Sequence, residues 1–339
     1  MSEFKVNSIT NQDGSAGPQI CGISTFSGKS GVQIPSGSTE FRRQDGGGRG
    51  RGIFGSGATP SATNVIDMIE IATTGNATDF GDDIHAREEG YAAFASATRG
   101  CFGGGQTPTF LSNIAYVTIS SQGGANDFGD LQTAQTRNVG LSDSTRGISA
   151  GGGDPVQTAG IEFVTIASTG DGANFGNLTQ ARAGAGACAS PTRGLVAGGY
   201  DSSGNHNIID FITIATLGNA TRFGNLTDDP NHPAGCSNNI RGLFGGGQNP
   251  SNVNTISYVT IATEGDAIDF GDLSSAKDYL GACASETRGL FGGGQTPTKI
   301  NVIEFVTIST TSDVTDFGDL TVARRFTMGL SDAHGGLAS

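Results

Sequence analysis

Four histidines are the first residues of this chain whose type could support catalysis or metal binding. They are His85, His206, His232 and His334. Each falls at a different position of an internal repeat, and no two have the spacing of metal ligands. Because a metal or catalytic site needs side chains that converge, we interpret these histidines as surface-loop residues. No nucleophile motif stands between a strand and a helix. The sequence therefore predicts no catalytic residue, no metal, no cofactor and no enzyme.

Repeated aspartates offer a second possible chemistry. They precede a phenylalanine or follow the next glycine, at Asp79, Asp127, Asp269, Asp316 and at Asp82, Asp130, Asp272, Asp319. Clustered carboxylates suit calcium, but Asp and Asn also cap their own backbone in turns. Asn177 and Asn225 replace the second aspartate in two copies, which favours the turn interpretation.

These positions belong to one unit that is repeated six times. Each copy opens with an arginine followed by a glycine-rich cluster, at Arg51, Arg99, Arg146, Arg193, Arg241 and Arg288. A phenylalanine follows 29 or 30 residues later, at Phe80, Phe128, Phe175, Phe223, Phe270 and Phe317. A period of 47 or 48 residues is typical of propeller repeats.

Each copy contains four short segments that favour β-strands. In the sixth copy the first is the short run that opens at Arg288, and the second is residues 300–309, which are rich in β-branched and aromatic residues. The third, residues 314–320, carries the phenylalanine, and a fourth segment rich in small residues follows. Four strands per copy without a helical period predict an all-β, six-bladed propeller. We interpret the six repeated arginines as links between blades.

The ring is expected to close through the C-terminus. In the other copies an apolar residue of the fourth segment stands five positions before the opening arginine. Before Arg51 that position is occupied by Gly46, so no strand of this type precedes the first copy. The missing strand instead resembles residues 327–333, because Gly329-Leu330-Ser331-Asp332 repeats the segment 140–143 residue for residue. Such a closure removes two open sheet edges.

Composition restricts the partners. The chain has 339 residues, 56 glycines, no tryptophan and a formal charge of −13, which argues against binding to nucleic acid. No apolar run approaches the roughly 20 residues that span a bilayer, and no signal peptide is visible, so we expect synthesis in a cytoplasm and no membrane insertion. Four of the five cysteines occupy apolar repeat positions, where a free cysteine acts as a small hydrophobe. Cys21 lies outside the repeats.

The unit resembles the kelch repeat. The triple glycine after an apolar strand, as at 103–105 and 292–294, looks like the kelch diglycine. A basic residue seven positions after the phenylalanine (Arg87, Arg182, Lys277, Arg324) is similar to the kelch arginine between blades. The chain departs from the pattern because it lacks tryptophan and because Gln135 and Pro230 interrupt the basic position. The resemblance implies architecture and no activity.

A narrower resemblance concerns the exact amino-acid sequence of the repeats. The segments ATTGNATDFGD (72–82) and RG-x-FGGG-x-TP are similar to repeats in virion structural proteins of tailed phages that infect marine cyanobacteria. The openings 4–14 and 22–28 are similar to the N-terminal segments of such proteins. This resemblance implies that residues 1–45 form a short, β-rich virion-attachment segment, joined by a Gly/Arg linker at 46–52 to the propeller at 51–339.

Recognition is expected in the loops that follow the glycine clusters. Loops of varied polar sequence on a rigid scaffold are common binding sites, although polar turns that only maintain solubility are an equal alternative. The residues we select as binding candidates are Gln106, Gln248, Gln295, Asp201 and Asn205.

Three functional hypotheses follow. The first is a non-enzymatic virion protein (tail fibre, neck or head decoration) that contacts other virion proteins through residues 1–50, forms a homo-oligomer in the particle and displays the propeller to a host glycan or receptor. The second is a glycan-binding or glycan-hydrolysing propeller. The third is a cellular kelch adaptor.

Overall fold

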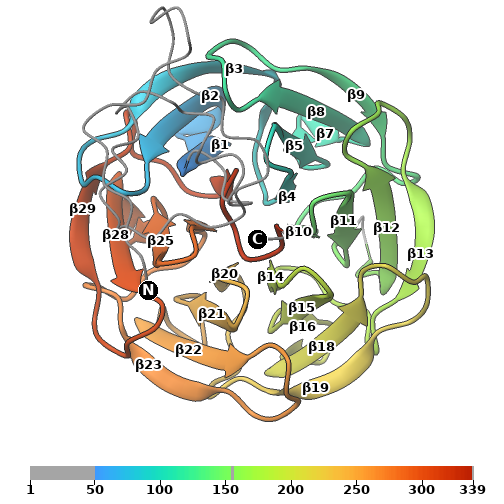
Figure 1. Cartoon of the computed structure of the whole chain (residues 1–339), viewed down its shortest axis with the longest axis vertical. Coiled ribbons are helices and arrows are strands. Elements are labelled where there is room, and N and C mark those ends of the chain that lie inside the picture. Colours follow the sequence, from blue (N-terminus) through green and yellow to red (C-terminus); the bar gives the residue numbers. More distant parts are fainter. Residues whose placement is uncertain (1–49, 154–155, 338–339) are drawn as a thin grey trace, which may run out of the picture. The chain divides into compact units, whose positions relative to one another are not determined.

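The chain folds as a six-bladed β-propeller, as the sequence predicts (Figure 1). The computed structural model describes residues 50–153 and 156–337. Within these ranges every regular element is a β-strand, and there is no helix that could cross a membrane. The expectations for residues 1–45, for Cys21 and for most of the linker lie outside the described residues.

Each blade is a four-stranded antiparallel sheet, named here from its innermost strand outward. Blade 1 contains β30 (Met328–Ser331), β1 (Arg51–Thr59), β2 (Ser61–Glu70) and β3 (Thr78–Arg87). Blade 2 contains β4 (Ala92–Ala95), β5 (Arg99–Gly103), β8 (Asn113–Thr118) and β9 (Asn126–Asp130). Blade 3 contains β10 (Val139–Ser142), β11 (Arg146–Ala150), β12 (Gly160–Thr165) and β13 (Ala173–Asn177).

The second half of the ring follows the same plan. Blade 4 contains β14 (Gly186–Ala189), β15 (Arg193–Ala197), β18 (Ile208–Thr213) and β19 (Thr221–Asn225). Blade 5 contains β20 (Ala234–Ser237), β21 (Arg241–Gly245), β22 (Thr255–Thr260) and β23 (Ile268–Asp272). Blade 6 contains β24 (Gly281–Ala284), β25 (Arg288–Gly292), β28 (Val302–Thr307) and β29 (Thr315–Asp319).

Short hairpins extend three of the blades on one face. They are β6 (Gln106–Thr107) with β7 (Thr109–Phe110), β16 (Tyr200–Asp201) with β17 (Gly204–Asn205), and β26 (Gln295–Thr296) with β27 (Thr298–Lys299). In the first copy the residues after the glycine cluster continue β1 and β2 instead of forming such a recognition loop, and the pairing reaches Thr59 and Ser61. The loop interpretation is therefore wrong for that copy.

The C-terminal strand closes the ring as expected. β30 pairs with β1 in antiparallel register, with Gly52 opposite Ser331 and Gly55 opposite Met328. The Leu330 side chain is 5% exposed and belongs to a core cluster shared by blades 1 and 2. The first and last copies are therefore joined through a full blade.

The six repeated arginines connect neighbouring blades, which confirms their interpretation as links. The Arg99 guanidinium lies 4.7 Å from the centroid of the Tyr116 ring in its own blade and donates to the Ile166 carbonyl oxygen of blade 3 at 3.1 Å. The equivalent arginines donate to backbone carbonyls one blade further on, and Arg288 reaches Ile71 of blade 1 at 2.9 Å. This ring of hydrogen bonds is the same at every blade junction and includes the closing one.

Buried ion pairs occupy the junctions that carry a basic residue. Arg182 donates to Asp210 at 2.9 Å, and both side chains are fully buried. Lys277 and Glu304 are 2.7 Å apart, and Arg324 and Asp67 are 3.1 Å apart. Breaking such a pair typically costs about 3–5 kcal/mol, because one charge stays buried alone. Arg87 is buried in the same way, against Asp83 of its own strand.

The two interrupted junctions differ from each other. Where Pro230 removes the base, Ser257 stands in place of the acid and lies 2.6 Å from the Thr227 hydroxyl. Where Gln135 removes it, the acid Glu162 persists and accepts a backbone hydrogen bond from Gln132 at 2.7 Å. Burial raises the pKa of Glu162 above its usual range.

The innermost strands alternate around the channel. Blades 2, 4 and 6 carry Ala-x-Ala, and blades 3, 5 and 1 carry Gly-x-Ser. The Ser142 hydroxyl donates to the Ala95 carbonyl at 2.8 Å, and a Cβ on Gly140 would lie 2.3 Å from the Ala93 oxygen. Glycine is therefore required at position 140, because the backbones of blades 2 and 3 approach closely. The same contacts recur between blades 4 and 5 and between blades 6 and 1, so the ring has a threefold pattern of blade pairs.

Candidate functional site

The two ends of the central channel differ. At one end the C-terminal segment 333–337 lies across the innermost strands (Figure 1). The His334 Nε2 lies 2.9 Å from the Ala95 carbonyl oxygen and therefore donates to it, while Nδ1 accepts from the Gly336 backbone at 3.1 Å. Gly335 donates to the Ser237 carbonyl at 2.9 Å. This segment closes that mouth of the channel.

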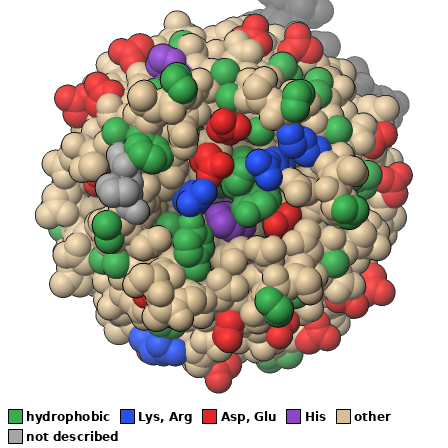
Figure 2. Space-filling model, turned by 180° about the vertical axis from the view of Figure 1, so that it is seen from behind, with side chains coloured by type: hydrophobic (Ala, Val, Ile, Leu, Met, Phe, Trp, Pro, Cys, Tyr) green, Lys and Arg blue, Asp and Glu red, His purple; other side chains and the backbone are tan. Residues whose placement is uncertain are grey.

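The opposite mouth is hollow and chemically mixed. Figure 2 shows basic, acidic, histidine and hydrophobic side chains around a depression in the middle of this face. Two kinds of connection meet here: the loops after the glycine clusters, and the segments that lead into the next innermost strand. Backbone hydrogen bonds join the two kinds of segment, as between Gln248 and Asn231 at 2.9 and 3.1 Å. The predicted recognition loops therefore surround this mouth.

One backbone position at the mouth is left-handed in every copy. It lies two residues before each innermost strand, at Gly90 (φ 71°), Arg137 (57°), Gly184 (61°), His232 (53°), Tyr279 (55°) and Phe326 (57°). Only glycine adopts this conformation freely, and other residues incur roughly 1–2 kcal/mol. Four of the six positions nevertheless carry a large side chain.

Architecture explains the backbone conformation but not these side chains. The amide of Arg137 donates to the Gly90 carbonyl at 2.8 Å, Gly184 donates to Arg137 at 2.9 Å, and His232 donates to Gly184 at 2.7 Å. Phe326 donates to Tyr279 at 2.8 Å. These four hydrogen bonds link neighbouring blades along the rim, and glycine could make each of them. The four large side chains therefore require another reason.

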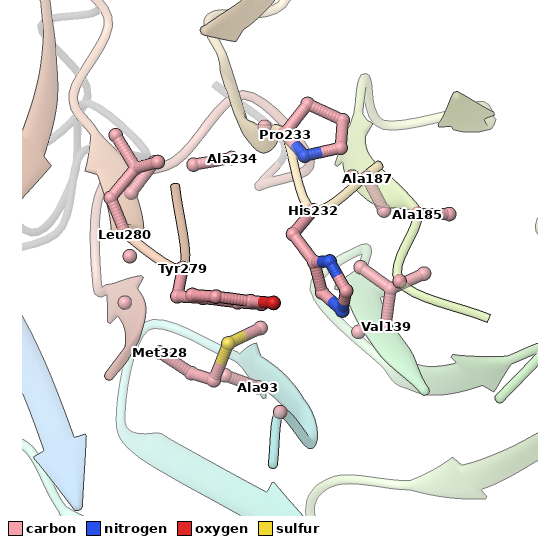
Figure 3. A pocket seen from close by; sticks show the side chains of 18 of the residues that line it. Ala93, Val139, Ala185, Ala187, His232, Pro233, Ala234, Tyr279, Leu280 and Met328 are labelled. Carbon is pink, nitrogen blue, oxygen red and sulfur yellow. The ribbon is translucent and has the colours of Figure 1, made fainter. Parts of the chain in front are cut away.

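Three of these side chains form an aromatic cluster at the mouth. The His232 and Tyr279 ring centroids are 4.5 Å apart, and those of Tyr279 and Phe326 are 4.2 Å apart. The Arg325 guanidinium lies over Phe326 at 5.0 Å. Figure 3 shows the Tyr279 ring and the His232 imidazole extending toward each other above small and apolar side chains, which include Ala93, Val139 and Met328.

A hollow of about 270 Å³ opens beside this cluster, toward blades 4 and 5. Its lining includes Tyr200, His232 and Tyr279, together with Arg137 and Gln248. The Tyr200 ring is 5.6 Å from that of His232. The Arg137 guanidinium donates to the Tyr200 hydroxyl at 2.8 Å and forms an ion pair with Glu89. The hollow therefore combines aromatic faces with polar edges.

A chain of amide side chains orients the imidazole. Asn205 Nδ2 donates to the Gln248 carbonyl at 3.0 Å, and Asn231 Nδ2 donates to Asn205 Oδ1 at 3.0 Å. Asn231 Oδ1 is then left to accept from His232 Nδ1, which lies 3.0 Å away. Burial and the nearby Arg137 charge lower the pKa of His232 to about 3. The imidazole is therefore neutral, with its proton on Nδ1.

The structure brings three of the five predicted binding residues to this hollow. Gln248 lines it, and Asn205 fixes His232 through the amide chain. Asp201 also lines it, but its carboxylate accepts from Gln180 at 2.7 Å and from the Ser203 backbone at 2.7 Å. These hydrogen bonds, with the Ser203 hydroxyl bond the largest contribution, hold the pKa of Asp201 well below its usual range.

The other two predicted residues lie elsewhere on the rim. The Gln106 amide donates to the Pro108 carbonyl within its own hairpin at 3.2 Å. Gln295 accepts from Arg325 at 3.0 Å. Both positions are equivalent to Gln248, but neither lines the hollow.

Sequence reasoning missed Arg137, His232, Tyr279 and Phe326. It treated His232 and His334 as surface-loop residues, whereas both are half-buried with specific partners. The repeat itself contained a signal. Aligning the residue two before each innermost strand gives Gly, Arg, Gly, His, Tyr and Phe, and a position that alternates between glycine and large residues is unusual for architecture alone.

The acidic tetrads lie in the outermost strands of their blades, as in β9 (Asn126–Asp130) and β23 (Ile268–Asp272), so the turn interpretation is wrong. The backbone amides of Asp130 and Asp272 donate to the carboxylates of Asp171 and Asp313 in the neighbouring blade, each at 3.0 Å. Within 50–153 and 156–337, no three His, Cys, Asp or Glu side chains gather as metal ligands would. Cys101, Cys188, Cys236 and Cys283 are buried free thiols, as their repeat positions predict.

A scan of the chain against protein-family models gave no match, and a search of curated proteins gave none either.

Proposed function

We propose that this protein is a non-enzymatic structural protein of a tailed-phage particle, and that its kelch-like propeller contacts a host surface through the hollow mouth. One observation carries the recognition part. Four large side chains occupy a left-handed rim position that glycine would fill without backbone strain. Strained residues of this kind cluster at ligand-binding positions.

The virion part is supported by the resemblance of residues 4–14 and 22–28 to phage N-terminal segments. Residues 1–50 would attach the protein to other virion proteins, in several copies, and the propeller would face outward. The experiment is a deletion of residues 1–50 in the phage genome. We expect particles that lack this protein, while the remaining chain still folds when produced separately. Normal incorporation of the shortened protein would contradict the attachment role.

The carboxylates near the mouth support binding rather than hydrolysis. Glycosidases need two carboxyl groups about 5–10 Å apart, one of which can donate a proton. Asp201 is held ionised by its hydrogen bonds, and Glu89 is paired with Arg137. Burial raises the pKa of Asp278 to about 6, but this side chain is 4% exposed and does not line the hollow. A reducing-sugar assay on host polysaccharide should therefore show no release, and measurable release would contradict this assignment.

A further inference from the structure

We infer that the hollow lined by Tyr200, His232 and Tyr279 binds one terminal ring of an uncharged carbohydrate. This inference rests on the proposed recognition function and names the ligand class of the same mouth. The rings provide apolar faces with an electron-rich surface. A pyranose ring presents C–H groups on its face and hydroxyl groups at its edge, so it is complementary to such a surface.

The edge of the hollow offers groups that match hydroxyls. Within the described ranges, the buried His232 Nε2 has no hydrogen-bond partner, and neither the Tyr279 hydroxyl nor the Gln248 side-chain amide is engaged in a hydrogen bond. A phenol and a carboxamide each donate and accept, as does a sugar hydroxyl. The aromatic rings therefore contact the face of one sugar ring, and the free polar groups hydrogen-bond to the hydroxyls at its edge.

The charge of the hollow favours a neutral ligand. Arg137 is the cation of the lining, and Glu89 neutralises it through their ion pair. His232 is uncharged, and the Asp201 carboxylate would repel an anion. No arginine or lysine of the lining is left to balance a carboxylate or sulfate on the ligand.

The size and surroundings favour a sugar over a protein. A volume of about 270 Å³ lies just below the usual range for ligand pockets, which starts near 300 Å³, so it suits a single ring. A stable protein partner would cover about 800 Å² around an apolar centre. The large hydrophobic side chains that are exposed among the described residues are Ile84, Phe110, Val156, Leu217, Ile240 and Ile268, and none of them lines the hollow.

The chain contains matched controls for a test. Tyr279→Phe removes only the hydroxyl and keeps the ring. Gln248→Ala removes the free amide, whereas Gln106→Ala changes the equivalent glutamine outside the hollow. His232→Gly removes the imidazole and leaves at this position the residue that Gly184 already has in the same conformation. Unchanged thermal unfolding of each variant would show that the fold is retained.

The full-length protein is applied to an array of neutral oligosaccharides, acidic oligosaccharides and peptides, and the strongest neutral binder is then titrated by calorimetry. We expect roughly tenfold weaker binding for Tyr279→Phe and for Gln248→Ala, loss of binding for His232→Gly and no change for Gln106→Ala. Binding only to acidic sugars or peptides, or neutral-sugar binding that the variants leave unchanged, would overturn the inference.

A parallel assay separates this inference from the proposed function. The wild-type protein and the His232→Gly variant are tested for adhesion to host cells. The wild type could adhere to host cells and the variant fail to adhere, while the wild type binds no sugar. That result would overturn the carbohydrate assignment but would support recognition at the mouth. Absence of both adhesion and sugar binding in the wild type would overturn both proposals.

Discussion

Ring closure predicts that Leu330 and Leu141 are energetically equivalent. Leu330 belongs to the C-terminal strand and Leu141 to the same strand of blade 3. A Cβ on Gly100 would lie 2.6 Å from the Leu330 side chain, and a Cβ on Gly194 would lie 2.6 Å from that of Leu141. The exposed fraction of each leucine is 4–5%. Each side chain therefore fills the space above a glycine of the next blade.

The magnitude follows from this burial. Replacing leucine by alanine removes three buried carbons, which corresponds to about 2.4 kcal/mol of transfer free energy. The surrounding backbones cannot collapse into the space, so the cavity raises the cost toward roughly 3–5 kcal/mol. We expect Leu330→Ala and Leu141→Ala to lower the free energy of unfolding by amounts that agree within about 1 kcal/mol.

The assay is urea unfolding followed by far-ultraviolet circular dichroism, with each variant measured against the wild type. A terminal strand that merely rests against the ring would give a small effect at Leu330 and the full effect at Leu141. A loss below about 1 kcal/mol for Leu330→Ala, beside a loss of several kcal/mol for Leu141→Ala, would refute ring closure as the source of stability.

Three further predictions concern the junctions and the channel. Arg182→Ala should lower the free energy of unfolding by about 3–5 kcal/mol because Asp210 stays buried and charged. Denaturant unfolding should show a smaller loss for the double variant Arg182→Met with Asp210→Leu. An equal or larger loss in the double variant would contradict the ion-pair account. Gly140→Ala should cost at least about 1–3 kcal/mol through overpacking against blade 2, whereas Gly124→Ala, whose Cβ would lie in ordinary contact 3.4 Å from the Asp82 carbonyl oxygen, should be near neutral in the same assay. Burial lowers the pKa of His334 below its usual value, so its contribution to stability is complete above about pH 6.5 and falls as pH decreases, because the unfolded chain binds the proton that the folded chain excludes. The difference in unfolding free energy between wild type and His334→Gln should therefore shrink on acidification, and a difference that stays constant would contradict this.

The architecture could be predicted because it repeats. The arginines, the phenylalanines and the triple glycines recur at fixed spacing, so each position was supported by its counterparts. The closing strand was found in the same way, through the match between 329–332 and 140–143. The repeated arginines were correctly interpreted because a side chain that recurs six times serves the unit and not one site.

The site could be predicted only in part, because a propeller mouth is built from residues on different blades. Gln248 and Asn205 were selected as loop residues, yet their role depends on Asn231, which lies in another segment. His232 was set aside because its counterparts are not histidines. The left-handed rim conformation, which makes that variation informative, is a property of the folded backbone and is not visible in residue types alone.

The central claim is that the mouth carrying His232 and Tyr279 is the recognition site. A crystal structure of the full-length protein with the strongest-binding array ligand tests it most directly. The account predicts electron density for one sugar ring over the His232 imidazole, within hydrogen-bond distance of the Tyr279 hydroxyl and the Gln248 amide. Density for the ligand on the rim of another blade or at the closed mouth, with this hollow containing only water, would contradict it.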